Sequence, residues 1–258
     1  MSDQNPLSTN VKTAYDGYYE KNDDGWRLLG AKYKVQHIID ICTGYSFNSV
    51  LEVGAGDGSI LKLLSDQNFA QKYSAVEISE SGVNRIKALN IKGLELVQEF
   101  DGYHLPFRDD EFDLVILSHV LEHVEHERLL LRELKRVSKM CLIEVPIDYK
   151  DGVDDRIKHF LAYGHINMYT PTSLRYLLLT EGFKVLNDLT SMIEPEVTRF
   201  NTYINQKKSK SIITDLKIAA EYSAKKLLCS LFGKPMQEKR ASAYTILCSK
   251  EGENLNIF

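Results

Sequence analysis

Three glycines, Gly54, Gly56 and Gly58, alternate with other residues directly after the apolar residues 50–53. Glycine suits a turn from a strand into a helix because it adopts backbone angles that other residues avoid. It also lets a ligand approach the backbone closely, since no side chain intervenes. The pattern predicts a strand–helix turn that binds a nucleotide-like ligand. A tight turn without a ligand is the alternative.

The charge and spacing around this loop favour a cationic ligand over a dinucleotide. The dinucleotide fingerprint is G-x-G-x-x-G, and its third glycine would fall at Ser59. Glu52 leads into the loop, and its carboxylate would attract a cation and repel a pyrophosphate. S-Adenosylmethionine carries a sulfonium cation and no phosphate, so it fits this loop better than a nicotinamide dinucleotide does.

A second carboxylate stands where a ribose would bind. Glu77 ends the next predicted strand along the chain. At that position a carboxylate can accept hydrogen bonds from both ribose hydroxyls. An exposed glutamate at a strand end is common by itself, but together with the glycine loop Glu77 indicates a nucleoside-binding site.

Histidines gather in the segment SHVLEHVEH at residues 118–126, after a further apolar strand. The spacing His119-x-x-Glu122-His123 matches the H-x-x-E-H motif of inverted zinc peptidases. That motif lies inside a helix, whereas this segment leaves a strand, so we predict no metal site. A neutral imidazole accepts a proton near neutral pH, which makes His119 and His123 candidate general bases. Alternatively, Glu122 and His123 only cap and orient the following helix.

The elements that must position these residues alternate along the chain. Apolar runs typical of buried strands occupy residues 49–53, 73–77, 94–97, 112–118, 140–145, 183–189 and 243–248. Helical patterns occupy residues 59–64, 80–89, 127–138 and 171–179. Such alternation predicts an α/β three-layer sandwich, in which a mostly parallel sheet carries helices on both faces.

The order of the motifs resembles one known family. The segments DGYHLPF at residues 101–107 and FDLV at 112–115 follow Glu77. With the glycine loop they resemble the class I S-adenosylmethionine-dependent methyltransferases, of the small-molecule and glycan type that includes ubiquinone-biosynthesis and sugar methyltransferases. The resemblance covers roughly residues 50–145 and resumes weakly at 170–189 and the last strand. It implies a Rossmann-like, seven-stranded sheet whose last strand is antiparallel.

The resemblance also implies a role for each residue near the cofactor. The methionine moiety would be lined by residues of the glycine loop: Glu52, Gly54, Ala55 and Gly56. Glu77 and Ile78 would hold the ribose and one face of the adenine. Asp101 would accept a hydrogen bond from the adenine amino group, and Gly102 would offer its backbone amide.

On the acceptor side, the resemblance places Ser118 and His119 beside the reactive methyl group. His165 would face the acceptor pocket from the loop after the fifth strand, or else cap the helix at Thr172. Some ubiquinone-type relatives bind a divalent metal through a carboxylate at the position of His119. The imidazole found here argues against such a site.

Composition limits the partners and the compartment. The chain has 258 residues, and its net charge of -4 argues against nucleic acid as a partner. No Asn/Asp-Pro-Pro-Tyr segment for a flipped base follows the fourth strand. The four cysteines lack metal-ligand spacing, the N-terminus lacks a signal sequence, and no apolar run approaches about 20 residues. We therefore predict a cytoplasmic protein.

Three regions are expected. Residues 1–44 would form a helical N-terminal lid with aromatic side chains, residues 45–189 and 241–250 the methyltransferase core, and residues 190–240 a helical insertion. Residues 205–240 contain nine Lys/Arg and three Asp/Glu. Apolar residues in this segment follow helical spacing: Ile213, Leu216, Ala220, Leu227 and Leu231.

This basic insertion allows two interpretations. It could dock on an anionic membrane that carries a lipid-linked acceptor, or grip a phosphorylated substrate. The interpretation that we favour is a lid helix whose apolar face packs on the core.

Together these features predict an S-adenosylmethionine-dependent methyltransferase that acts on an oxygen or nitrogen of a small molecule or saccharide. One alternative is a non-catalytic S-adenosylmethionine-binding regulator or partner, which the acceptor-side histidines argue against. Another is a nicotinamide-dependent oxidoreductase, which the missing third glycine and the Asp101 segment disfavour. The pattern makes no prediction about oligomeric state.

Overall fold

The computed structural model of the protein describes residues 24–150, 152–158, 160 and 164–252. Seven strands form one sheet in the order β3-β2-β1-β4-β5-β7-β6. They are β1 (Ser49–Val53), β2 (Lys72–Glu77), β3 (Leu94–Glu99), β4 (Phe112–Ser118), β5 (Ser138–Pro146), β6 (Lys184–Ser191) and β7 (Ala243–Ser249). Neighbours from β3 to β5 are parallel, and β7 is antiparallel to both β5 and β6. The predicted Rossmann-like sheet is confirmed.

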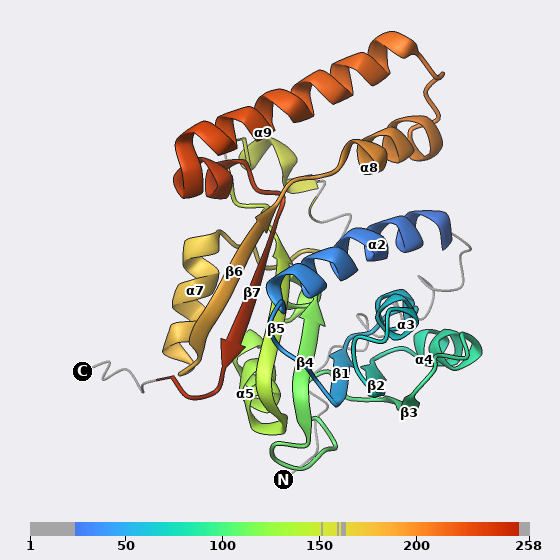
Figure 1. Cartoon of the computed structure of the whole chain (residues 1–258), viewed down its shortest axis with the longest axis vertical. Coiled ribbons are helices and arrows are strands. Elements are labelled where there is room, and N and C mark those ends of the chain that lie inside the picture. The colour runs from blue at the N-terminus through green and yellow to red at the C-terminus, as the bar shows by residue number, and fades with distance from the viewer. Residues whose placement is uncertain (1–23, 151, 159, 161–163, 253–258) are drawn as a thin grey trace.

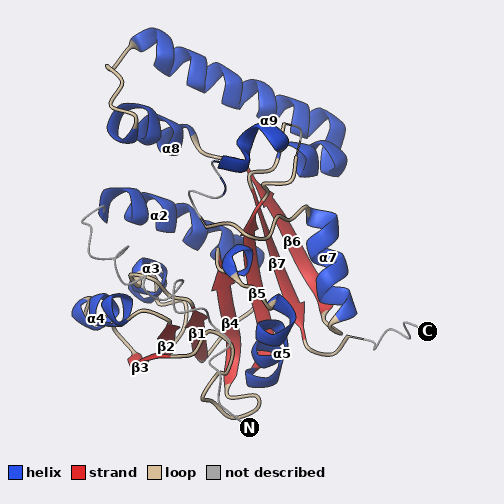
Figure 2. Cartoon of the chain, turned by 180° about the vertical axis from the view of Figure 1, so that it is seen from behind, coloured by secondary structure: helices blue, strands red, loops and turns tan. Residues whose placement is uncertain are grey.

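Helices cover both faces of this sheet, as Figures 1 and 2 show. One face carries α2 (Asp24–Ile41), α3 (Ser59–Asp66) and α4 (Glu80–Ala88), and the other carries α5 (Glu127–Val137) and α7 (Pro171–Thr180). Because side chains alternate along a strand, β4 supplies both cores. Its Leu114 and Ile116 pack with α2 and α3, whereas Val115 and Leu117 pack with α5 and α7.

Local signals in the sequence account for where several helices begin. Thr170 caps α7 by exchanging hydrogen bonds with Ser173, and Pro171 occupies the first helical position. Ser79 caps α4 by accepting a hydrogen bond from the backbone of Gly82. Short 3-10 turns, η1 (Leu121–His123) and η2 (Asp154–Arg156), lie in the connections after β4 and β5.

The insertion between β6 and β7 leaves the sheet and is helical. It contains α8 (Pro195–Phe200), a π-helical turn η3 (Asn201–Asn205) and α9 (Ile212–Arg240), in which Gly233 interrupts the helical backbone. In Figure 1 these elements lie beyond the end of the sheet at which β6 ends and β7 begins. Among the described helices, none combines the length and the apolarity that a membrane span requires.

The favoured prediction for this insertion is wrong. The apolar spacing of α9 is present, but Ile213 is 80% exposed and Leu216 is 66% exposed, so this face does not pack on the core. Polar contacts occupy the inward side instead. The hydroxyl of Tyr222 donates to Glu194 at 2.8 Å, and Asp215 pairs with Arg199 of α8 at 3.2 Å.

Candidate functional site

Three of the predicted site residues lie at the carboxyl ends of neighbouring strands in the middle of the sheet. Glu52 lies near the end of β1, Glu77 ends β2 and Ser118 ends β4. These three strands are neighbours and run parallel, so their carboxyl ends open toward the same crevice, the usual ligand site of such sheets. Glu144 of β5 stands opposite Ser118 in the register and adds a carboxylate that sequence reasoning missed.

The glycine loop wraps over the end of β2. Gly54 donates its N–H to the carbonyl of Val76 at 2.9 Å, and Gly56 donates to the Glu77 carboxylate at 2.9 Å. Gly54 has a φ of +69°, and a Cβ there would lie 2.6 Å from a methyl of Val120. Only glycine fits that position, so no side chain covers the backbone of the loop there.

Glu77 joins the glycine loop to α4. Besides Gly56, its carboxylate accepts hydrogen bonds from the backbone and the hydroxyl of Ser79, at 3.2 and 3.0 Å. Burial raises the pKa of Glu77 even though these donors oppose the shift. Gly82 also belongs to this arrangement, because a Cβ there would lie 2.7 Å from the Glu77 side chain. A glycine inside a predicted helix is the signal that could have pointed to it.

Glu52 carries a buried carboxylate with an incomplete set of partners. It is 2% exposed, and its Oε2 has no hydrogen-bond partner among the described residues. Burial raises its pKa well above the usual range, and the charges of Asp57 and Glu77 add to this, whereas Lys34 of α2 opposes it. A sulfonium or ammonium group in the crevice would supply the missing charge.

Asp101 shapes its own loop. Its Oδ1 accepts hydrogen bonds from the backbone of Tyr103 and His104 at 2.9 and 2.7 Å, and its Oδ2 lies 2.7 Å from the His104 ring. Burial would raise its pKa, but these donors lower it overall. Gly102 is buried with a φ of +91°, and Ile78 is half-buried directly after β2. Their contacts with adenine stay predictions.

His119 lies between two buried carboxylates. Its Nε2 is 3.1 Å from Glu144 and its Nδ1 is 3.5 Å from Glu122, each of which is 1% exposed. Its φ of +56° is rare for a residue other than glycine. Burial and the charge of Lys34 disfavour its protonation, but the two carboxylates outweigh them and raise its pKa. The two carboxylates therefore favour the imidazolium form more than water does.

Glu144 itself is held by three side chains from distant parts of the chain. Apart from His119, it lies 3.3 Å from the ring of His37 on α2 and accepts a hydrogen bond from Thr245 of β7 at 2.9 Å. Burial would raise its pKa, but the two histidines lower it far below the usual range. A single acidic residue inside the apolar run of β5 is the signal that could have identified it.

His123 and His165 come together from different loops. Their rings meet edge to face with centroids 4.9 Å apart. His123 Nδ1 lies 3.0 Å from the carbonyl of Gly164, and His165 Nδ1 lies 2.6 Å from Asp148. Burial lowers the pKa of His123, and the neighbouring histidines add to this while Glu122 opposes it. His123 therefore favours the neutral imidazole.

Glu122 joins these two histidines in a group that could hold a metal ion. One ligand atom from each of Glu122, His123 and His165 lies within 4.8 Å of the others. Neither oxygen of Glu122 has a hydrogen-bond partner among the described residues. The predicted absence of a metal stays a prediction.

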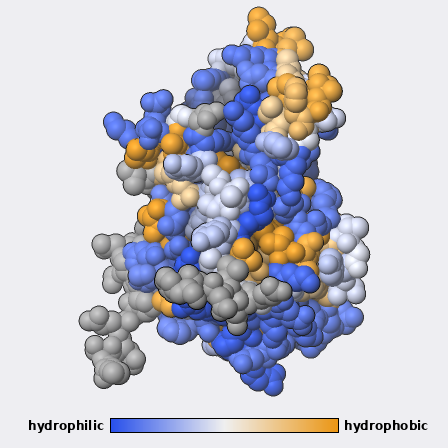
Figure 3. All heavy atoms as spheres, turned by 90° about the vertical axis from the view of Figure 1, so that its left-hand side faces the viewer, coloured by the Kyte–Doolittle hydropathy of each residue, from blue (hydrophilic) through white to orange (hydrophobic). Residues whose placement is uncertain are grey.

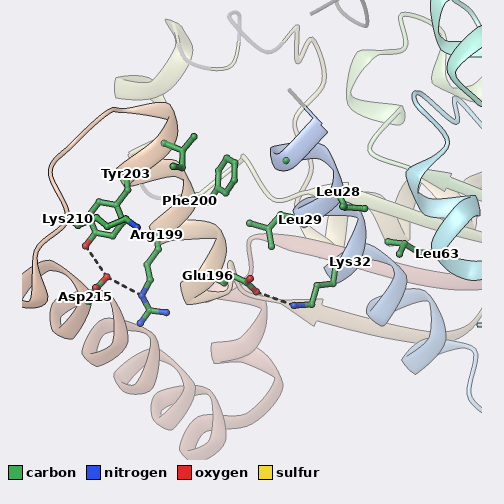
Figure 4. A pocket seen from close by; sticks show the side chains of 12 residues that line it. Leu28, Leu29, Lys32, Leu63, Glu196, Arg199, Phe200, Tyr203, Lys210 and Asp215 are labelled. Carbon is green, nitrogen blue, oxygen red and sulfur yellow. Dashed lines mark hydrogen bonds and ion pairs between the residues drawn. The ribbon is translucent and has the colours of Figure 1, made fainter. Parts of the chain in front are cut away.

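A cavity of about 700 Å³ lies elsewhere, between α2 and the insertion (Figure 4). Its walls combine apolar side chains with cations, among them Leu28, Leu29, Leu63, Phe200, Lys32 and Arg199. On α2, helical spacing puts Leu28 and Lys32 on the side opposite Arg27 and His37. Those two residues contact Asp57 and Glu144. One side of α2 thus contacts the site, and the other lines this cavity.

The structure describes only part of the expected aromatic lid at the N-terminus. Of the expected lid aromatics, Tyr15, Tyr18 and Tyr19 lie outside the described residues. Trp26 contacts Phe200 of α8, with ring centroids 5.7 Å apart, so it packs against the insertion. The division into lid, core and insertion stays a prediction.

Comparisons with known proteins agree on one family. A family model described as "Methyltransferase domain" matches residues 27–187. YrhH of Bacillus subtilis (strain 168), which is named as a methyltransferase, is 30% identical over 124 residues, covering 45% of this chain and 69% of YrhH.

Solved structures share the fold. A chain from the complex between the Haloferax volcanii Trm112 methyltransferase activator and a methyltransferase aligns with a TM-score of 0.63 and 15% identity, over 92% of this chain and 97% of that one. The YcgJ protein from Bacillus subtilis aligns with a TM-score of 0.57 and 18% identity, over 86% of this chain and 100% of that one.

Proposed function

The chain belongs to the methyltransferase domain family and is an S-adenosylmethionine-dependent enzyme, and we propose that its acceptor is an oxygen or nitrogen of a small molecule or saccharide. The observation that carries this proposal is the group His119, His123 and His165 beside the end of β4. Base chemistry of this kind serves a hydroxyl or ammonium acceptor, which must lose a proton. The family match sets the nicotinamide-dependent oxidoreductase aside.

The crevice fits the methyl donor at two buried polar atoms. Glu52 Oε2 and Ser118 Oγ each lack a hydrogen-bond partner among the described residues. We assign Glu52 to the positive charges of the methionine moiety, because a cation would stabilise its ionised form. Ser118 would contact the donor beside the acceptor pocket. When bound, S-adenosylmethionine supplies a methyl group on a sulfonium, which is a strong electrophile.

Glu77 and the glycine loop would bind the rest of the donor. Each carboxylate oxygen has two acceptor positions, and Gly56 and Ser79 occupy three of the four in Glu77. The position that remains on Oε2 would accept a hydrogen bond from a ribose hydroxyl. Gly54, Ala55 and Gly56 present backbone without bulky side chains. We assign Ile78, Asp101 and Gly102 to the adenine.

Among the histidines, His123 is the better general base. Its lowered pKa keeps the ring neutral near pH 7, and a neutral imidazole can accept a proton from an acceptor. His119 lies between Glu122 and Glu144, which raise its pKa, and it would hold the Glu122 carboxylate and the acceptor in place. His165, oriented by Asp148, would position the His123 ring.

The test is a screen of small hydroxyl and amine acceptors for release of S-adenosylhomocysteine. His123→Gln should lower kcat by about 100-fold or more while donor affinity stays within about threefold. His126→Gln is the matched control, since His126 lies in the same segment and contacts Tyr103 outside the acceptor group. Full activity of His123→Gln would refute the base assignment. Donor binding without product from any acceptor would favour the non-catalytic S-adenosylmethionine-binding protein.

A further inference from the structure

The long helix α9 carries its apolar side outward. The exposed side chains recur at intervals of three or four residues and so lie on one face of the helix. We call this face the outer stripe, and its residues are Ile213 (80% exposed), Leu216 (66%), Ala220, Leu227 (60%) and Leu231 (67%). In Figure 3 hydrophobic side chains gather at the top of the molecule, which α9 occupies in Figure 1.

Contacts on the opposite face hold this orientation. Asp215 pairs with Arg199 and accepts a hydrogen bond from Tyr203 at 2.9 Å. About two turns further on, the hydroxyl of Tyr222 donates to Glu194, and Cys229, about two turns beyond that, is 7% exposed. The stripe cannot turn toward the sheet without breaking these contacts.

The orientation of α9 is the reverse of that of most surface helices. A surface helix normally buries its apolar side against the core and shows its polar side to water. An exposed contiguous apolar surface marks a site at which something else binds. The outer stripe therefore requires a partner that covers it.

The charge of the insertion selects among partners. Residues 205–240 contain nine basic and three acidic residues. All three acidic side chains have partners within the chain: Asp215 with Arg199, Glu221 with Lys217, and Glu238 with Arg175. The positive charge is therefore left in excess.

Most of this excess lies on exposed lysines. Within the described part of the chain, five of them form no ion pair: Lys207, Lys208, Lys210, Lys225 and Lys226. By helical spacing, Lys217 lies on one side of the outer stripe and Lys226 on the other. An apolar stripe between lysines matches helices that lie in the headgroup layer of a bilayer.

We propose that the outer stripe of α9 and its flanking lysines dock on an anionic phospholipid surface. The apolar side chains would enter the headgroup boundary, and the lysines would reach the lipid phosphates. A second copy of this chain is a poorer partner, because pairing two such helices would bring two strongly basic segments together. The acidic remainder of the molecule would face away from the bilayer.

The test measures partition of the full-length chain into sedimented vesicles. The vesicles are phosphatidylcholine with or without about 30% phosphatidylglycerol, at about 0.1 M salt. The chain should bind the anionic vesicles about tenfold more tightly or better, and the difference should shrink at about 0.5 M salt.

Two variants separate the apolar from the electrostatic part. Leu216→Asn with Leu227→Asn should lower binding about tenfold or more. Lys217→Gln with Lys226→Gln should lower it by about fivefold for each lysine. All four residues are exposed, so donor binding and the circular dichroism spectrum should be unchanged.

Matched controls make the same changes elsewhere on the surface. Leu129→Asn with Leu179→Asn alters two leucines that are 45% and 43% exposed on α5 and α7. Lys87→Gln with Lys184→Gln removes the same charge from exposed sites. Both controls should bind anionic vesicles as the unaltered chain does.

Three results would overturn the proposal. One is equal partition into anionic and neutral vesicles, and another is equal loss in the α9 variants and the controls. The third is a dimer that binds no vesicles and that Leu216→Asn with Leu227→Asn converts to a monomer, which would assign the stripe to a second copy. None of these results bears on methyl transfer, which the release of S-adenosylhomocysteine measures separately.

Discussion

Replacing Glu52 by glutamine should stabilise the fold and weaken binding of the methyl donor at the same time. The carboxylate is 2% exposed and its Oε2 lacks a hydrogen-bond partner among the described residues, so its charge opposes folding. Glutamine keeps the shape and an unpaired oxygen but removes the charge, whose extra desolvation cost is about 1–3 kcal/mol, so the free energy of unfolding should rise by that order in Glu52→Gln. Lys34 offsets part of the cost, which favours the lower half of the range.

Donor binding should change in the opposite direction. Removing one member of a buried charge pair costs about 2–5 kcal/mol, and the presence of Lys34 near the carboxylate again reduces the effect. We therefore expect S-adenosylmethionine to bind Glu52→Gln about 30- to 150-fold more weakly, or about 2–3 kcal/mol. If Glu52 faces the ammonium group, S-adenosylhomocysteine should lose the same factor. If it faces the sulfonium, the product should lose less.

The pH dependence has a definite sign. Because folding raises the pKa of Glu52, the folded state holds its proton more tightly than the unfolded state does. The destabilisation is absent below the unfolded pKa of 4.5 and grows as the pH rises through the folded pKa. The stability difference between Glu52→Gln and the unaltered chain should therefore widen with rising pH. The charged groups that act on the Glu52 carboxylate are Lys34, which lowers its pKa, and Asp57 and Glu77, which raise it.

Urea denaturation at several pH values and titration calorimetry with both ligands measure these effects. Glu95→Gln is the control, because it removes the same charge from an exposed position on β3. A Glu52→Gln protein that is less stable than the unaltered chain, or that binds the donor with unchanged affinity, would refute the reasoning.

Three further predictions concern the same crevice. His119→Ala should lower kcat while the donor affinity measured by calorimetry changes less than about threefold, and equal losses of both would contradict its place on the acceptor side. If His123 is the base, its lowered pKa should keep kcat/KM level above pH 6.5, the ordinary imidazole value, with a fall only below it. A fall that begins above pH 6.5 would instead indicate His119, whose pKa is raised. Gly82→Ala should weaken donor binding about tenfold or more, since its Cβ would lie 2.7 Å from the Glu77 side chain, and unchanged affinity in the same calorimetry would show that Glu77 can move freely.

The fold was predictable because its signals are local. Each buried strand is a short apolar run, and the glycine loop, Ser79 and Thr170 mark helix starts within a few residues. The direction that the α9 stripe faces was not predictable. Periodicity shows that apolar residues share a face, but tertiary contacts such as that between Tyr222 and Glu194 decide which way the face turns.

The site divides in the same way. Glu52, Glu77 and Ser118 could be found because each lies at the end of a strand or one residue before it, and parallel strands bring their ends together. Lys34 and His37 could not, since they reach the crevice from a helix that precedes the whole sheet. Their spacing within α2 shows no pattern that distinguishes them from ordinary surface residues.

The buried carboxylates separate the donor half of the crevice from the acceptor half. On the β4 and β5 side, Glu122 and Glu144 have histidine partners that lower their pKa values despite burial. On the β1 and β2 side, Glu52 and Glu77 have raised pKa values, because burial outweighs the hydrogen bonds and the single lysine nearby. The first pair has positive partners within the chain that outweigh its burial, whereas the single lysine near the second pair does not outweigh the burial there. We infer that the missing cation is the bound donor, so that its positive charge lies over β1 and β2 and its methyl group points toward the histidines.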